Sequence, residues 1–137
     1  MAKHKSADVR DIVLCGHAGA GKTILAEAML FKAKMVNRLG SVADGSTVSD
    51  YEKEEKDYQY SLNSSVMHLA HAGKEFNLVD TPGQVDFQGG MLSGMVAADT
   101  ALICINAMRG IELMTRKAWD AAERLGLGKI IVITRMD

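Results

Sequence analysis

The stretch Gly16-His17-Ala18-Gly19-Ala20-Gly21-Lys22-Thr23 decides how this chain is interpreted. It matches the pattern G-x-x-x-x-G-K-[ST], in which glycines let the backbone wrap closely around an anion with several N–H groups pointing inward. A short apolar run, 12–15, precedes it and a helix-forming run, 24–34, follows it. Because the helix that starts there adds its positive end, this order predicts a phosphate site. An ordinary glycine-rich turn is the alternative.

Two side chains of this loop have defined expected tasks. Lys22 is expected to reach the β- and γ-phosphates of a nucleotide, and the Thr23 hydroxyl is expected to bind Mg²⁺. The other loop residues are expected to line the nucleotide with their backbone; they are Gly16, His17, Ala18, Gly19, Ala20 and Gly21.

The composition is that of a single soluble globular domain. The chain has 137 residues, of which 47% are hydrophobic and 24% are charged, with a net charge of −1. This balance excludes a global electrostatic pull toward nucleic acid or membrane. No apolar run approaches a membrane span and the polar start is not a signal peptide, so we expect a cytoplasmic location and no membrane partner.

The cysteines and histidines do not suggest a metal site. Cys15 and Cys104 lie in apolar strand-like runs without metal-ligand spacing, which favours small buried hydrophobes over the alternative of a catalytic thiol. His17, His68 and His71 fall in different expected elements without zinc spacing.

Strand-like and helix-like segments alternate along the chain, which predicts an α/β fold with a largely parallel sheet. The expected strands are 11–15, 61–72, 75–79, 100–106 and 129–134, and the expected helices are 21–34, 87–98 and 112–125. The short link at 72–74 makes the second and third strands an antiparallel hairpin. Residues 40–60 are expected to be irregular, and the mixed charges of 51–60 suggest a solvated, mobile segment.

The two ends of the chain differ in what they predict. Residues 1–9 are expected to form a flexible tail, followed by a partial domain over 10–137. The chain stops after a strand with no closing helix, and an uncovered parallel strand exposes apolar surface. We therefore expect a fragment of a longer protein, with a natural short form as the alternative.

A second motif, Asp80-Thr81-Pro82-Gly83, follows an apolar strand at the sheet edge where ligands bind. Asp80 can hold a water on the Mg²⁺ that Thr23 binds, and the Gly83 N–H can donate to a γ-phosphate. Alone, the tetrapeptide also fits a plain turn. Behind a phosphate loop it predicts the D-x-x-G switch of GTPases.

With both motifs in place, the sequence from Arg10 to Asp137 resembles the GTP-binding domain of translation elongation factor G. The likeness extends over residues 80–87 and to the final Thr134-Arg135-Met136-Asp137, where the family has N-K-M-D. It implies a P-loop NTPase fold, C-terminally truncated, in which a mostly parallel twisted sheet has one antiparallel hairpin strand and helices on both faces. It places a first switch at about 40–61 and a second at about 80–98.

The resemblance also implies chemistry and partners. It implies binding of GTP and GDP with Mg²⁺, GTP hydrolysis, and the ribosome as partner of the full-length protein, without sequence-specific contact to nucleic acid. In the family the terminal aspartate accepts two hydrogen bonds from guanine, a task that falls to Asp137. Arg135 would cover the base, and Thr134 would brace the phosphate loop where the family has asparagine. A merely solvated Asp137 is the alternative, and we expect reduced guanine affinity because the chain ends here.

Several departures suggest a divergent elongation-factor-G-like paralogue. Gln84 stands where the family has the histidine taken to position the attacking water, and glutamine has that role in other GTPases. The family's R-G-I-T is Tyr58-Gln59-Tyr60-Ser61, so the Ser61 hydroxyl would replace a Mg²⁺-binding threonine. Gly19 stands where the family has aspartate. Catalysis would then depend on Lys22, Gly83 and Gln84.

The sequence thus predicts a Mg²⁺-dependent GTPase that acts in ribosomal translation elongation. Intrinsic hydrolysis should be slow, because no arginine is obviously placed to neutralise the developing charge. The first alternative is a nucleotide-dependent binding switch with little or no hydrolysis. The second is an ATPase or kinase-like protein, which is disfavoured because adenine offers Asp137 nothing to pair with.

Overall fold

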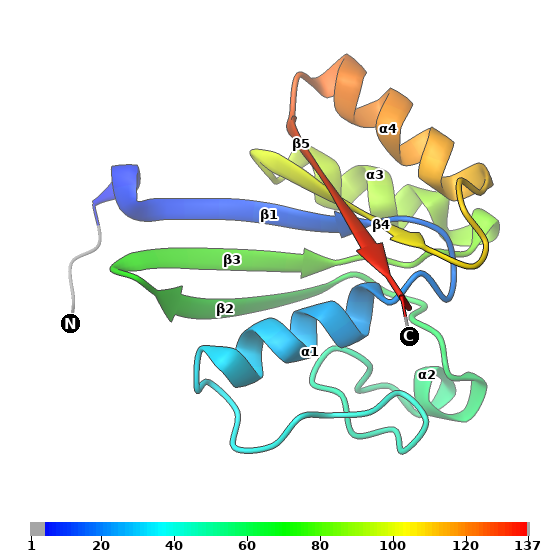
Figure 1. Cartoon of the computed structure of the whole chain (residues 1–137), viewed down its shortest axis with the longest axis horizontal. Helices are drawn as coiled ribbons and strands as arrows, with labels where there is room; N and C mark the ends of the chain where they lie inside the picture. Colours follow the sequence, from blue (N-terminus) through cyan, green and yellow to red (C-terminus); the bar gives the residue numbers. More distant parts are fainter. Residues whose placement is uncertain (1–4, 137) are drawn as a thin grey trace.

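The computed structural model describes residues 5–136, which surround a five-stranded sheet of order β2-β3-β1-β4-β5 (Figure 1). The strands are β1 (Val9–Cys15), β2 (Ser65–His71), β3 (Lys74–Asp80), β4 (Thr100–Asn106) and β5 (Gly128–Thr134). β1 pairs in parallel with β3 and β4, β4 pairs in parallel with β5, and only β2 is antiparallel. The predicted α/β class, with its single antiparallel hairpin strand, is confirmed.

Helices cover both faces of this sheet. They are α1 (Lys22–Lys32), α2 (Lys53–Tyr58), α3 (Gln88–Val96) and α4 (Leu113–Leu125), with single 3₁₀ turns η1 (Ser6–Asp8) and η2 (Val85–Phe87). α1 lies on one face and α3 and α4 lie on the other (Figure 1). Neighbouring strand residues point to opposite faces. Accordingly Leu14 packs with Leu30 of α1, whereas Val13 packs with Met95 of α3.

The hairpin between β2 and β3 follows the expected turn chemistry. His71 is paired with Lys74, which leaves a two-residue loop. Both loop residues have positive φ, +49° at Ala72 and +74° at Gly73. Two such residues are typical of the type I′ turn, whose twist matches that of the strands. The hairpin strand itself begins at Ser65, four residues later than predicted.

Two regions are more ordered than the sequence predicts. The segment 40–60 was expected to be irregular, but Lys53–Tyr58 form α2, which begins with a capping box between Glu52 and Glu55. The expected tail 1–9 is also partly structured, because Ser6–Asp8 form η1 and Val9 begins β1. The carboxylate of Asp8 pairs with Lys74 Nζ at 2.5 Å, which ties this end to the hairpin.

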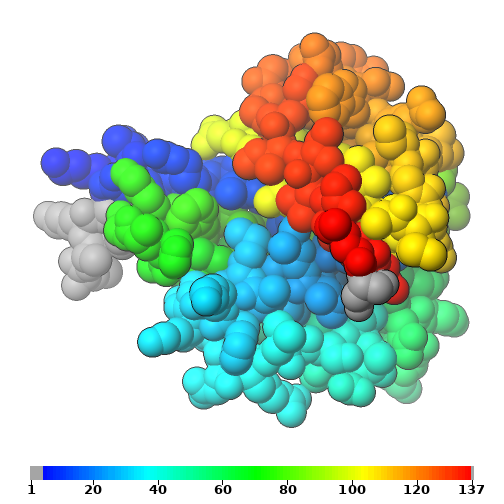
Figure 2. Space-filling view, viewed as in Figure 1, coloured from blue at the N-terminus to red at the C-terminus, as the bar shows by residue number. Residues whose placement is uncertain are grey.

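β5 is the least covered strand. It pairs with β4 alone and lies at the surface of the molecule, as its red atoms show in Figure 2. Ile131 is 51% exposed and Ile130 and Ile133 are 48% exposed. The apolar surface expected at the last strand is therefore present. None of the helices in the described part of the chain is long and apolar enough to cross a membrane.

Candidate functional site

The phosphate loop lies between the end of β1 and the start of α1, as predicted, and glycine is required at its first residue. Gly16 has φ +138°, and a Cβ on it would lie 2.5 Å from the carbonyl oxygen of Cys104 in β4. Only a residue without a side chain can cross the strand so closely. At the other end, Gly21 has φ +81° and is the N-cap residue of α1.

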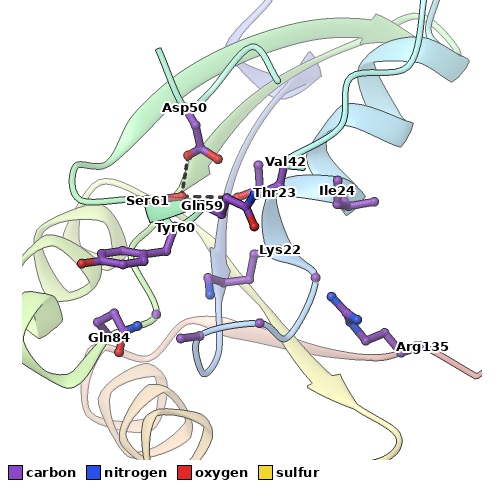
Figure 3. A pocket seen from close by; sticks show the side chains of 14 residues that line it. Lys22, Thr23, Ile24, Val42, Asp50, Gln59, Tyr60, Ser61, Gln84 and Arg135 are labelled. Atoms are coloured by element: carbon purple, nitrogen blue, oxygen red, sulfur yellow. Dashed lines mark hydrogen bonds between the residues drawn. The ribbon is translucent and has the colours of Figure 1, made fainter. Parts of the chain in front are cut away.

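The loop, both predicted switches and the end of β5 meet in one pocket (Figure 3). The predicted site residues that line it are Ala18, Gly19, Gly21, Lys22, Thr23, Ser61, Gly83, Gln84 and Arg135. Ile24, Val42, Asp50, Gln59 and Tyr60, which the motifs did not single out as site residues, complete the lining. Asp137 lies outside the described residues.

Lys22 is buried against the backbone of the phosphate loop. Its Nζ donates to the carbonyl oxygens of His17 at 3.0 Å and Gly16 at 3.3 Å. Burial lowers the pKa of Lys22, and the nearby carboxylate of Asp80 opposes this shift. The ammonium group is thus held against the backbone of the phosphate loop and borders the pocket.

A chain of oxygen atoms connects the first helix with both predicted switch segments. Thr23 Oγ1 donates to Asp80 Oδ2 at 2.6 Å and lies 3.4 Å from Ser61 Oγ. Ser61 Oγ in turn donates to Asp50 Oδ1 at 2.7 Å (Figure 3). Residues that are 57 positions apart in the sequence, such as Thr23 and Asp80, are therefore in direct contact.

These oxygens suit a magnesium ion. Mg²⁺ prefers carboxylate, hydroxyl, water and phosphate oxygens, and it usually takes only one or two carboxylates from the protein. Asp80 is 1% exposed, and no hydrogen bond of regular geometry reaches its Oδ1, although the Ser49 hydroxyl faces the carboxylate. Burial raises the pKa of Asp80 to about 6, so a cation would favour its charged form. Thr23, Ser61 and Asp80 therefore fit the ion predicted for them.

Asp50 was missed by the sequence analysis. It is 2% exposed and accepts hydrogen bonds from Ser61 and Thr47. Burial raises the pKa of Asp50, and the Ser61 hydroxyl lowers it. Its sequence neighbourhood looks like a solvated polar segment, and only the tertiary contact with Ser61 reveals it.

The segment 40–63 is fastened by two buried glutamates. Glu27, on the inner side of α1, accepts the backbone N–H groups of Gly40 and Val48. Glu55 of α2 is 1% exposed and accepts the N–H groups of Leu62 at 2.9 Å and Asn63 at 3.1 Å. The prediction of a solvated segment at 51–60 was therefore wrong for Glu55.

Gln59 ends α2 in an unusual conformation. Its φ of +58° lies in the left-handed region that favours glycine. The resemblance places the family's glycine at this position, so the backbone keeps the shape that glycine adopts readily. A side chain there carries a conformational cost of about 1 kcal/mol.

The predicted second switch begins directly against the phosphate loop. Thr81 Oγ1 donates to the carbonyl of Leu14 at 2.6 Å, which fixes the turn to β1. A Cβ on Gly83 would lie 2.6 Å from the backbone nitrogen of Ala18 and closer still to Lys22 Nζ. Gln84 follows at the same pocket, on the side opposite Arg135 (Figure 3).

The end of β5 braces the loop from its other side. Thr134 Oγ1 lies 2.9 Å from the carbonyl of Ala20, to which it donates, and 3.2 Å from that of Ile105. Threonine thus makes the link expected of it. Arg135 follows with φ +51° and borders the pocket.

The cysteines are packing residues, as predicted. Cys15 and Cys104 are both buried, and burial raises the pKa of each thiol to about 12. Within residues 5–136 no group of three or more His, Cys, Asp or Glu side chains could hold a metal ion.

Comparison with known proteins gives the same result as the motifs. The model of the elongation factor Tu GTP binding domain family matches residues 7–137. An elongation factor G-like protein of Mycobacterium tuberculosis is 43% identical over 129 residues, which are 94% of this chain and 18% of that protein. The mitochondrial ribosome-releasing factor 2 of Drosophila willistoni is 35% identical over the whole chain and is likewise covered over 18% of its length.

Solved structures agree on the fold. The crystal structure of a protein from Thermus thermophilus superposes with a TM-score of 0.90 at 40% identity, covering 93% of this chain and 19% of that one. The bacterial selenocysteine-specific elongation factor EF-Sec gives a TM-score of 0.74 at 21% identity, which shows a shared fold alone. The chain thus spans about a fifth of the length of the proteins that it matches.

Proposed function

Because the chain belongs to the elongation factor Tu GTP-binding domain family, we propose that it binds GTP and GDP with Mg²⁺ and hydrolyses GTP. The observation that carries this proposal is the contact of Gly83 with the phosphate loop at Ala18 and Lys22. A terminal phosphate bound by that loop would have to share its space with the switch glycine. Its arrival or loss would therefore move the segment that follows Gly83, as in other order–disorder switches.

Each residue has a stated role in this proposal. Lys22 and the loop N–H groups bind the phosphates, while Thr23, Ser61 and, through water, Asp80 would hold Mg²⁺. When bound, Mg²⁺ supplies positive charge against the phosphate oxygens. Gln84 orients the attacking water, and the Gly83 N–H senses the γ-phosphate. Positioning and charge lower the barrier, since the protein forms no covalent bond to the nucleotide.

Guanine selection is assigned to the end of the chain. Asp137 would accept two hydrogen bonds from the base, and Arg135 would cover it. Exposure of Arg135 beside the pocket supports its part of this assignment.

The full-length protein is proposed to use GTP cleavage for a conformational switch in ribosomal translation elongation, with the ribosome as partner, as an elongation-factor-G-like paralogue. A cytoplasmic location is part of the proposal, although some relatives are named as mitochondrial.

A second candidate function is a nucleotide-dependent binding switch that cleaves little GTP. Tyr58-Gln59 in place of the family's Arg-Gly favours it, since the end of α2 then carries no arginine. The two candidates differ in chemistry but share nucleotide binding.

The first experiment is a competition of unlabelled GTP, GDP, ATP and ADP against fluorescent GDP. We expect guanine nucleotides to compete at least tenfold better than adenine nucleotides, because a carboxylate pairs with the guanine edge only. Tighter ADP binding would overturn the proposal in favour of an ATPase.

Single-turnover hydrolysis then separates the two candidates. GTP cleavage that ribosomes accelerate and Gln84→Ala slows supports the GTPase. Clear GTP binding with no cleavage at saturating ribosomes selects the binding switch.

A further inference from the structure

The turn that follows β4 places an arginine against the phosphate loop. A Cβ on Gly19 would lie 3.6 Å from Arg109 Nη1, so the guanidinium group rests on the open side of this glycine. Gly19 is exposed, borders the pocket and has φ +74°. Arg109 belongs to none of the motifs. Its position beside Gly19 differs from the expectation that no arginine is placed near the phosphates.

The turn that holds Arg109 is firmly built. Asn106 at the end of β4 is 5% exposed, and its side-chain oxygen accepts the N–H of Met108 at 2.9 Å. Its backbone carbonyl accepts the N–H groups of Arg109 at 3.2 Å and Gly110 at 2.8 Å. The backbone of Arg109 is thus fixed relative to the loop, which lowers the entropic cost of using its side chain.

The charges around the guanidinium leave it available. The nearest carboxylate along the chain is that of Glu112, three residues after Arg109. It lies 3.6 Å from His17 Nε2 and forms no ion pair with Arg109. Among the residues that the structure describes, no side chain forms an ion pair or a hydrogen bond with the Arg109 guanidinium. Its five N–H donors therefore remain open to a ligand.

We propose that Arg109 binds the phosphate tail of the nucleotide from the open side of Gly19, as a second cation beside Lys22. The proposal rests on the proposed function, because it needs a polyphosphate in the loop. Arginine suits the task, since its planar fork matches two phosphate oxygens at once. Glycine at position 19 favours this arrangement, because its φ of +74° suits glycine and a side chain longer than one methyl group would enter the space that the guanidinium uses.

The test measures binding of fluorescent GTP to the 137-residue chain and to four variants. Arg109→Ala removes the side chain, Arg109→Gln removes the charge but keeps much of the length, and Arg109→Lys keeps the charge without the fork. Arg116→Ala is the matched control, since Arg116 is an exposed arginine on α4 that borders a different pocket, beside Trp119. Circular dichroism melting verifies that each variant is folded.

We expect Arg109→Ala and Arg109→Gln to weaken GTP binding about tenfold, the size of one charge-assisted hydrogen bond. Arg109→Lys should lose less, and Arg116→Ala should match the parent. The difference between parent and Arg109→Ala should shrink as salt is raised, because an exposed charge contact is screened. Equal affinities for the parent and both uncharged Arg109 variants would overturn this inference and leave the proposed function intact. A parent chain that binds no guanine nucleotide would overturn both.

Discussion

At the scale of single residues, the absence of a side chain at Gly83 lets the predicted second switch approach the phosphate loop closely. Gly83 is buried, and the space beside its Cα is filled by the backbone of Ala18 and the ammonium of Lys22. Its φ is not in the left-handed region, so close approach rather than conformational freedom requires glycine here. Thr81, hydrogen-bonded to Leu14, prevents the turn from shifting away without cost.

Gly83→Ala should therefore disturb the site, whereas Gly89→Ala should not. The new Cβ would lie 2.6 Å from a backbone nitrogen that cannot give way, so the turn or the loop must move. We expect GTP affinity to fall at least tenfold. At Gly89, in α3, a Cβ meets nothing within 4 Å, and alanine should keep affinity and add about 0.5–1 kcal/mol of stability. Fluorescent GTP titrations and melting curves measure both, and equal affinity of the two variants would contradict the steric argument.

At the scale of elements, the segment 40–63 owes its shape to buried carboxylates rather than to its own propensities. α2 has only six residues, far fewer than an isolated helix needs for stability in water. Glu55 replaces the missing packing by accepting three backbone N–H groups, from Glu52, Leu62 and Asn63. Glu55 thus fixes α2 relative to Leu62 and Asn63, the two residues that follow Ser61.

Glu55→Ala should loosen this segment while its neighbour Glu54→Ala does not. Removal of the carboxylate leaves three N–H groups without their acceptor, at a cost of about 2–3 kcal/mol. Hydrogen exchange at the amides of Leu62 and Asn63 should then be at least tenfold faster. Glu54 is exposed, so its alanine variant is the matched control. Unchanged exchange in Glu55→Ala would show that other contacts hold the segment.

At the scale of the whole molecule, three apolar clusters stabilise the chain, one on the sheet face beneath α3 and α4 and two on the opposite face. Cys15 belongs to the cluster beneath α3 and α4, and Cys104 belongs to the one that includes Ala20 of the phosphate loop. Each thiol has a pKa of about 12 because it is buried. Chemical labelling of Cys15 and of Cys104 therefore reports on the two faces of the sheet separately.

Both thiols should resist labelling at pH 8 in the folded chain, and both should become reactive over the same range of urea concentration as the chain unfolds. With a pKa of about 12, the thiolate fraction at pH 8 is on the order of 1 in 10⁴, and burial also blocks the reagent. Burial favours the protonated thiol in the fold, so this protection is present below about pH 9 and weakens as pH rises toward 12. Mass spectrometry of iodoacetamide adducts along a urea series measures the extent of labelling of each cysteine. Labelling of one thiol well before the other would show that the two faces unfold separately.

Local patterns were enough to predict much of the fold. The loop at 16–23, the turn at 80–83 and the hairpin at 72–74 each depend on residue types a few positions apart, and alternating apolar runs placed the strands and helices. The errors lie where long-range contacts override local character. α2 forms in a polar stretch because its glutamate is buried against distant backbone.

The sequence by itself determined the phosphate loop, the switch turn and the order of the elements, because short-range sterics and periodicity fix these. Only the tertiary structure decided that Asp50 receives the Ser61 hydroxyl and that Arg109 rests on Gly19. The contact of Arg109 with Gly19 joins the turns that follow β4 and β1, which are neighbours because parallel strands bring their carboxyl ends to one edge of the sheet. Sequence spacing contains no measure of that proximity, since it arises from the packing of the whole sheet.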